Sequence, residues 1–421
     1  MKLTKTLKIK IGKLSNNKNN ILNTLINKNT KAINFCLNKA KNEKITHDLV
    51  YKDLRKLNLP STIIHGCRAK SIEIIKSYRK LKKRNYKANF PELKNSRIRY
   101  DNQVVKLRHT NNKLYPEFVS LLYKAGIRGK SDNRIELPLI INSDYQKDII
   151  KDIETKYKLG STELIKKNNE FYIHISYSKE TEIPNPDETF NPIGIDIGIN
   201  NLAVSVTPSK VTFYSGKRLM WKNKFFRRQR QKLQENLALE EIKRLKARQT
   251  KYNNHYINHI SKNIIEQAKK EVKPVIVMEN LTNINETKVR KSQRAKHSEW
   301  VWKRLQLAIQ YKALWDNIPV VYINPQFTSQ ICLKCLSTNK RVKHNYKCNY
   351  CGYKANADYV GAKNISKKFF DTICIEEQAS INNAFNPNSQ ELKAERDIGV
   401  KNLQEKEDAI PLTFENVSTL A

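Results

Sequence analysis

Three acidic residues stand where apolar, strand-like segments end or a helix-like segment begins. Asp196 lies in IGIDIG, Glu279 ends PVIVME, and Asp358 begins the helix-like part of NADYVGAKNI. A buried carboxylate is costly unless it is paired or bound to a metal. Alone, each acid fits a solvated loop edge or a helix cap. Together, carboxylates at one sheet edge can share hard cations, because neighbouring strands lie about 5 Å apart.

That donor set predicts phosphodiester hydrolysis. Two divalent ions stabilise the attacking and leaving oxygens of this reaction. Carboxylates and water suit Mg²⁺ or Mn²⁺ better than Zn²⁺. The sequence offers no catalytic thiol, serine triad or glycine-rich phosphate loop that competes with this interpretation. We therefore predict a nuclease that uses two Mg²⁺ or Mn²⁺ ions.

Four clustered cysteines indicate a second, different metal. Two CxxC pairs, Cys332 with Cys335 and Cys348 with Cys351, are separated by twelve residues. Two such pairs complete a closed tetrahedral site for one structural Zn²⁺ ion, which has no open position for water. Two redox dithiols are the alternative, which the short shared segment disfavours. The remaining cysteines are expected to be inert: Cys36, Cys67 and Cys374.

The charge of the chain points to a polyanionic partner. Its 421 residues include 79 Lys+Arg and 40 Asp+Glu, a formal net charge of +39. A positive field of this size favours the binding of nucleic acid. A/T-rich codons encode Lys, Asn and Ile, however, so the composition of the genome is an alternative source of part of the lysine excess. Basic helical stretches are candidate contacts, and solvated helix faces are the plain alternative. The candidates are Arg79, Lys80, Arg84, Arg227, Arg228, Arg230 and Lys232.

Two or three domains are expected from the length. Residues 2–11 alternate as a strand, residues 20–42 have helical spacing, and a helix follows Pro60 with Ser61 as its N-cap. Residues 97–178 contain short strand-like segments that suggest a small sheet or barrel. Residues 181–192 resemble a linker. The second half follows an α/β order: three strands, a basic helix over 217–271, a strand ending at Glu279, a helix at 297–316, a strand near 319–325 and a helix at 358–370.

From the sequence we expect neither secretion nor insertion into a membrane. No apolar run approaches the ~18–20 residues that span a bilayer, and the basic N-terminus lacks the apolar stretch of a signal peptide. A reducing cytoplasm is the expected setting. No membrane partner is expected.

The order IGIDIGINNLAV, VIVMENL and PQFTSQICLKC followed by YKCNYCGYKANADYVGAKNI resembles the RuvC-like nuclease core of the transposon-encoded TnpB family and the related compact type V CRISPR effectors. The resemblance covers about residues 193–366. It implies a multidomain α+β fold: a wedge-type β-barrel with a helical recognition insert, then a ribonuclease H-like (RuvC) α/β domain with an inserted Cys₄ zinc ribbon. The implied ranges are 1–15 and 90–180 for the barrel, 16–89 for the helical domain, 193–325 and 356–370 for the nuclease domain, 326–355 for the ribbon, and 371–421 for a peripheral or disordered tail.

The same resemblance implies an RNA-guided DNA endonuclease. Such a protein would be prokaryotic and cytoplasmic, and would associate with the nucleoid. Its partners would be a guide RNA and target DNA, and it would act as a monomer or homodimer. Its catalytic and Mg²⁺-binding positions fall on Asp196, Glu279 and Asp358, and its zinc ligands on the four clustered cysteines. Two positions depart from the family pattern: Leu336 stands where Gly is usual, and Val360 where Asn is usual.

Two other interpretations remain. An RNA-guided DNA-binding protein or regulator with weak or no cleavage is favoured by Val360 and opposed by the three intact acids. A protein-only nuclease such as a junction resolvase needs neither the upstream residues nor the ribbon. Copurified RNA would separate the guided proteins from the resolvase.

Overall fold

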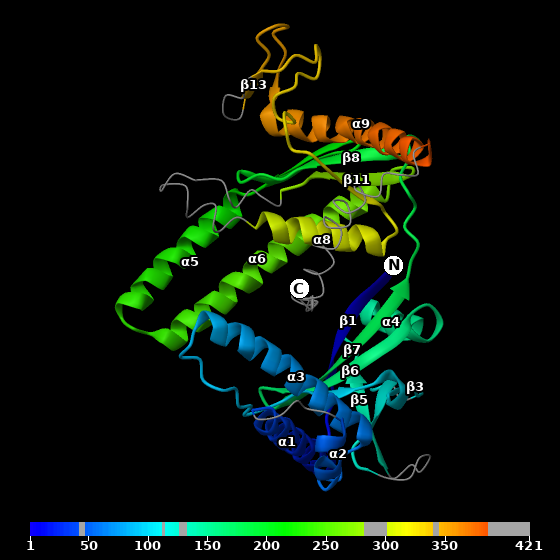
Figure 1. Ribbon diagram of the computed structural model, residues 1–421, viewed down its shortest axis with the longest axis vertical. Helices are drawn as coiled ribbons and strands as arrows, with labels where there is room; N and C mark the ends of the chain where they lie inside the picture. Colours follow the sequence, from blue (N-terminus) through cyan, green and yellow to red (C-terminus); the bar gives the residue numbers. More distant parts are fainter. Residues whose placement is uncertain (42–46, 112–113, 126–132, 282–300, 340–344, 386–421) are drawn as a thin grey trace. The chain divides into compact units, whose positions relative to one another are not determined.

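The computed structural model describes residues 1–41, 47–111, 114–125, 133–281, 301–339 and 345–385 (Figure 1). The chain divides between residues 180 and 181 into an N-terminal and a C-terminal compact unit, with Met1 belonging to the second. Among the described residues, no helix combines the length and the apolarity that crossing a bilayer requires.

The N-terminal unit is built on a seven-stranded antiparallel sheet in the order β2-β6-β7-β1-β5-β4-β3. The predicted alternation of residues 2–11 is confirmed, because Leu3, Leu7, Ile9 and Ile11 are buried on one strand. The strands are β1 (Lys2–Ile11), β2 (Ile98–Tyr100), β3 (Lys106–His109), β4 (Glu117–Leu122), β5 (Arg134–Ile140), β6 (Lys158–Lys167) and β7 (Glu170–Glu180).

The expected barrel is not what the described strands form. The sheet is open, with β2 at one edge and β3 at the other, and the two are not paired with each other. Closure would need a ladder between these edges, but β2 has three residues and β3 four. The prediction of a sheet holds, and the ladders of the described strands do not show a closed barrel.

Four helices accompany this sheet: α1 (Asn16–Lys39), α2 (His47–Arg55), α3 (Ser61–Arg84) and α4 (Asp144–Thr155). The two long helices were expected. The N-cap of α3 is Pro60, however, and Ser61 is the first helical residue. The helix α4 was not among the predicted elements, although Ser143 caps it and Ile149, Ile150 and Ile153 form its buried face.

The C-terminal unit is built on a mixed five-stranded sheet in the order β10-β9-β8-β11-β12. The three strands β8 (Asn191–Asp196), β9 (Asn201–Val206) and β10 (Val211–Ser215) are antiparallel neighbours. The strands β11 (Pro274–Glu279) and β12 (Val320–Ile323) continue the sheet in parallel with β8. All five were predicted from the sequence.

Helices cover both faces of this sheet (Figure 1). One face packs on α6 (Leu239–Ala268) and α8 (Trp302–Trp315) through a large apolar cluster. The other face packs on α9 (Ala357–Phe385), where Ile365 and Phe369 meet Val275 and Val277. The sheet is therefore the middle layer of an α/β/α arrangement.

Helix boundaries differ from the expected ones in three places. The predicted basic helix 217–271 is two helices, α5 (Lys217–Glu235) and α6, joined by a turn at Leu237, whose φ of 51° interrupts the helix. The helix expected at 297–316 is α8, and residues 297–300 lie outside the described residues. The last helix continues past residue 370 to Phe385, so the tail expected at 371–421 begins as helix; residues 386–421 lie outside the described residues.

Candidate active site and zinc ribbon

Asp196 and Glu279 lie on the same face of two neighbouring strands. The parallel ladder pairs Ile195 of β8 with Met278 of β11, one residue before each acid. Side chains alternate between the faces of a strand. Since Ile195 and Met278 point into the cluster with α6 and α8, Asp196 and Glu279 belong to the opposite face, which α9 covers.

Two glycines allow α9 to come close to β8. A Cβ added at Gly194 would lie 2.0 Å from the carbonyl oxygen of Ala362, so only glycine fits beneath the helix backbone there. A Cβ added at Gly361 would lie 2.9 Å from Oδ2 of Asp196. The carboxylate of Asp196 is therefore lodged against the helix one turn after Asp358.

Asp358 lies in the first turn of α9 and is only 8% exposed. The side-chain oxygen of Asn356 accepts hydrogen bonds from the backbone N–H groups of Asp358 and Tyr359, which fixes the start of the helix. The positive end of the helix dipole favours a carboxylate at this position. Asn201, at the start of β9, donates a hydrogen bond of 2.8 Å to Oδ2 of Asp358.

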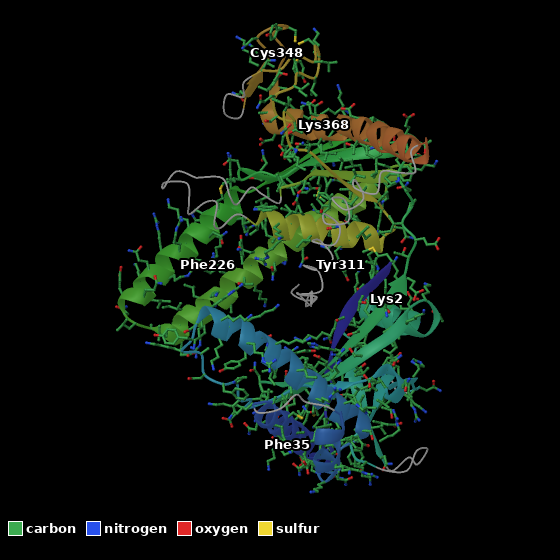
Figure 2. The ribbon with its side chains drawn as sticks, viewed as in Figure 1. Lys2, Phe35, Phe226, Tyr311, Cys348 and Lys368 are labelled. Carbon is green, nitrogen blue, oxygen red and sulfur yellow. The ribbon has the colours of Figure 1, made fainter. Side chains whose placement is uncertain are left out.

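Glu279 is held by the segment that follows β12. The hydroxyl of Thr328 donates to Oε1 of Glu279, and Gln306 of α8 donates to the Glu279 carbonyl at 2.8 Å. Asn364 of α9 holds this segment through the carbonyl oxygens of Thr328 and Ile331, both at 2.8 Å. Lys368, which Figure 2 labels on α9, lies one turn further along the helix and donates to the carbonyl of Gln326.

The three carboxylates thus lie where α9 packs on the sheet, and Glu279 and Asp358 each accept a hydrogen bond from a neighbouring side chain. Among the described residues, the four clustered cysteines form a group of ligand atoms close enough to hold one metal ion, and the three acids do not form such a group. As donors they suit a hard cation, because all are carboxylates. Their role as metal ligands and catalytic residues stays a prediction.

The four predicted zinc ligands are brought together. All four sulfur atoms lie within 4.8 Å of one another, with Cys332 and Cys351 at 3.6 Å and Cys335 and Cys348 at 3.5 Å. Four thiolates at Zn–S distances of about 2.3 Å would be about 3.8 Å apart. The cluster therefore fits a structural zinc ion. The strands β13 (Asn345–Lys347) and β14 (Lys354–Asn356) form the hairpin that carries the second CxxC pair into α9 (Figure 2).

Hydrogen-bond donors prepare these sulfur atoms for a cation. The backbone N–H groups of Lys334 and Cys351 point at Cys332 and Cys348, both at 3.4 Å. Burial opposes ionisation of Cys348, but N–H groups of Cys351 and Tyr350 and the Ser337 hydroxyl outweigh it and lower its pKa to about 5. The Ser337 hydroxyl also lowers the pKa of Cys335. For Cys335 and Cys348 the thiolate, the form that binds zinc, is thus favoured. At Cys351 the backbone N–H of Tyr353 favours ionisation, but burial and the neighbouring cysteines outweigh it and raise the pKa to about 12.

The isolated cysteines of the N-terminal unit have the opposite environment. Cys36 and Cys67 are fully buried between α1 and α3. Burial raises the pKa of Cys36 to about 11 and raises that of Cys67 further. Protonated thiols are poor nucleophiles and ligands, in agreement with the expectation that they are inert. The side chain of Cys374 lies outside the described part of the chain.

The two departures from the family pattern have structural explanations. Val360 is fully buried and packs with Cys332, Tyr346 and Cys348 in the apolar cluster of the ribbon. It therefore faces the ribbon core. Leu336 has φ 61°, the left-handed conformation for which glycine is suited, and its side chain is 66% exposed.

The candidate nucleic-acid residues lie on two helices. Arg79, Lys80 and Arg84 are exposed in the last turns of α3, and Arg228 and Lys232 are exposed on α5. Arg227 is partly buried on α5. Arg230 donates to Gln249 of α6, which in turn holds Asn223. Arg230 thus contributes to packing of the α5–α6 hairpin, and nucleic-acid contact by all seven residues remains a prediction.

The residues that position the candidate site were not predicted from the sequence. Asn201, Thr328 and Asn364 are single polar residues whose roles depend on contacts across the fold. Gly194 did carry a signal, since it interrupts an apolar strand, where glycine often marks the close approach of another backbone.

Comparison with known proteins supports this architecture. Residues 174–285 match the family model described as "Probable transposase", and residues 302–365 match "Cas12f1-like, TNB domain". The TnpB-like protein MJ0751 of Methanocaldococcus jannaschii is 32% identical over 252 residues, which are 55% of this chain and 86% of the relative. The chain belongs to the TnpB/Cas12f-like family.

More distant relatives match part of the sequence of this TnpB/Cas12f-like chain, or share its fold. The CRISPR-associated endodeoxyribonuclease Cas12f1 of Sulfoacidibacillus thermotolerans is 29% identical over 243 residues, 52% of this chain and 56% of that protein. A cryo-EM structure of a Cas12f1–sgRNA–target DNA complex shares the fold, with a TM-score of 0.60 and 17% identity, over 87% of this chain and 99% of the other. The multidomain α+β fold thus resembles that of Cas12f.

Proposed function

We propose that this chain is an RNA-guided DNA endonuclease whose ribonuclease H-like (RuvC) unit hydrolyses phosphodiester bonds with two divalent metal ions. One observation carries the proposal: Asp196 and Glu279 share one face of adjacent parallel strands, and α9, whose first turn carries Asp358, packs on that face. Relatives named as endodeoxyribonucleases support it. The partners proposed are a guide RNA and target DNA, as in the complex named for Cas12f1.

Each residue has a defined part in this proposal. Asp196, Glu279 and Asp358 would hold Mg²⁺ or Mn²⁺, which supplies charge stabilisation for the attacking and leaving oxygens. Asn201 and Thr328 orient two of the carboxylates through hydrogen bonds. The zinc ribbon packs its core against Ala357 and Val360 on either side of Asp358, and so supports the turn that carries this acid.

A guided DNA-binding protein with weak or no cleavage is the second candidate. Val360 was the sequence feature that favoured it. Because Val360 is buried in the ribbon cluster, this residue does not by itself argue for an impaired site. The first candidate is therefore preferred.

The test uses the protein with its copurified RNA. Sequencing that RNA identifies the guide segment, and a plasmid carrying the matching target is incubated with the complex and Mg²⁺. We expect cleavage by the natural protein, loss of cleavage in Asp196→Ala, and full cleavage in Asp187→Ala, which changes an exposed acid of the linker. Guided binding without cleavage would favour the second candidate, and absence of bound RNA would exclude both.

A further inference from the structure

The helix α5 combines positive charge with exposed aromatic rings. Its nineteen residues include eight Lys or Arg and a single acid, Glu235. Trp221 is 66% exposed and Phe225 is 40% exposed. Large rings on a surface this basic are not explained by folding, because their burial would stabilise the chain and their exposure does not.

The exposed rings form an ordered pair. Trp221 and Phe225 are one helical turn apart and nearly parallel, with centroids 6.3 Å apart and an angle of 18° between planes. The ammonium group of Lys222 lies 4.8 Å from the centroid of Phe225 and 5.9 Å from that of Trp221. This cation–π geometry holds a positive charge beside the rings.

The rings continue inward toward a cavity. Phe226 meets Tyr252 of α6 edge to face at 6.4 Å, and Tyr252 stacks on Tyr256 at the same centroid distance (Figure 2 labels Phe226 on α5). A cavity of about 440 Å³ opens beside them, and its lining includes Phe213, Arg218, Tyr252, His255, Tyr256 and His259. Arg218 lies one turn before Trp221 and Lys222 on the same helix face.

We propose that the stacking surface, formed by Arg218, Trp221, Lys222, Phe225 and the adjoining cavity, binds unpaired bases of a single-stranded nucleic acid. Flat rings can stack on any base, and the surrounding cations can neutralise the backbone phosphates. Paired bases are stacked inside a duplex and do not present their faces. The charge of α5 argues for a polyanion rather than a second protein chain. The inference rests on the proposed function only in that nucleic acid is the ligand.

Two fluorescent probes test the proposal. One is a short oligothymidylate, and the other is an abasic chain with the same number of phosphates. If Trp221 stacks on a base, Trp221→Ala lowers affinity for oligothymidylate by about tenfold and leaves affinity for the abasic chain unchanged. Trp221→Phe retains most of the affinity. A matching oligouridylate shows whether DNA or RNA is preferred.

Leu239→Ala is the matched control, because Leu239 is an exposed apolar residue of α6, 67% exposed, that carries no ring. The proposal is overturned if Trp221→Ala binds oligothymidylate as the natural protein does, or if it weakens both probes equally, which indicates a structural role. A change of oligomeric state with unchanged affinity would assign the surface to contact between copies. Asp196→Ala leaves the stacking surface intact and should bind both probes normally. Loss of plasmid cleavage, which tests the proposed function, is therefore distinguishable from loss of probe binding, which tests the stacking surface.

Discussion

At the scale of single residues, the candidate site depends on a glycine that leaves space for a carboxylate as well as on side chains that donate hydrogen bonds to carboxylates. The Asp196 carboxylate lies against Gly361, where the helix offers no side chain. Asn201 and Thr328 contact the other two acids. Small changes at these positions should alter the geometry of the carboxylates without unfolding the sheet.

The substitution Gly361→Ala tests the position of the Asp196 carboxylate separately from the stability of the protein. Alanine favours a helix by about 1 kcal/mol over glycine, but its Cβ would lie 2.9 Å from Asp196 Oδ2 and displace the carboxylate. We expect plasmid cleavage to fall by about a hundredfold with an unchanged or raised thermal midpoint. Gly194→Ala is the contrast, because its Cβ would meet backbone at 2.0 Å and lower both. Equal loss of stability in the two variants would contradict the prediction.

Leu336 stores strain in the zinc ribbon. A non-glycine residue in the left-handed conformation costs roughly 1–2 kcal/mol, and the exposed side chain of Leu336 offers little packing in return. Leu336→Gly should therefore slow zinc release to a colorimetric chelator by about fivefold or more. Leu336→Ala keeps the strained backbone and should show no gain. Faster release from Leu336→Gly would show that the leucine supports the ribbon.

The sequence predicted residues whose chemistry is local and missed those whose role is set by contacts. The four cysteines were recognisable because ligand spacing along the chain determines their site, and the structure assembles them. The positions of the three acids at strand and helix ends were also predicted correctly. Nothing near Thr328 or Asn201 in the chain indicates that each would meet an acid far away in sequence.

At the scale of elements, the periodic strands of the C-terminal unit were predictable and the breaks between helices were not. The segment 217–271 is helical almost throughout, and Leu237 is not a residue type that predicts a turn. Barrel closure in the N-terminal unit depends on pairing between β2 and β3, which their sequences do not specify. Long-range strand pairing decides whether the sheet closes.

The contact between α6 and α8 contains Lys312, a lysine whose pKa is lowered. Lys312 donates to the Ser261 hydroxyl at 2.6 Å and to the Asn258 carbonyl at 2.9 Å. Burial, with a smaller effect of Lys262, lowers the pKa of Lys312 to about 8. An unfolded lysine has a pKa of about 10.4. Between these values the unfolded chain binds more protons, so the contribution of Lys312 to stability rises with pH.

Lys312→Met isolates this effect. Below pH 8 the natural protein carries the full cost of a buried charge, of the order of 3 kcal/mol. We expect the stability of the natural protein relative to the variant to increase from pH 8 to pH 10, measured as the difference in thermal midpoints by circular dichroism. Lys303→Met, at an exposed position of the same helix, should show no such trend. A difference that is constant with pH would refute the prediction.

At the scale of the whole molecule, the net charge of +39 predicts how binding depends on salt. A protein that neutralises six to ten phosphates loses roughly 10³- to 10⁵-fold in affinity between 50 and 200 mM salt. We expect a loss in this range for a DNA duplex without a match to the guide, measured by fluorescence anisotropy on the purified complex. Arg228→Ala should reduce the log–log slope by about one. Lys156→Ala should not, because Lys156 is paired with Asp152 at 3.0 Å. A flat salt response would mean that the positive charge of this chain does not contact the nucleic-acid backbone.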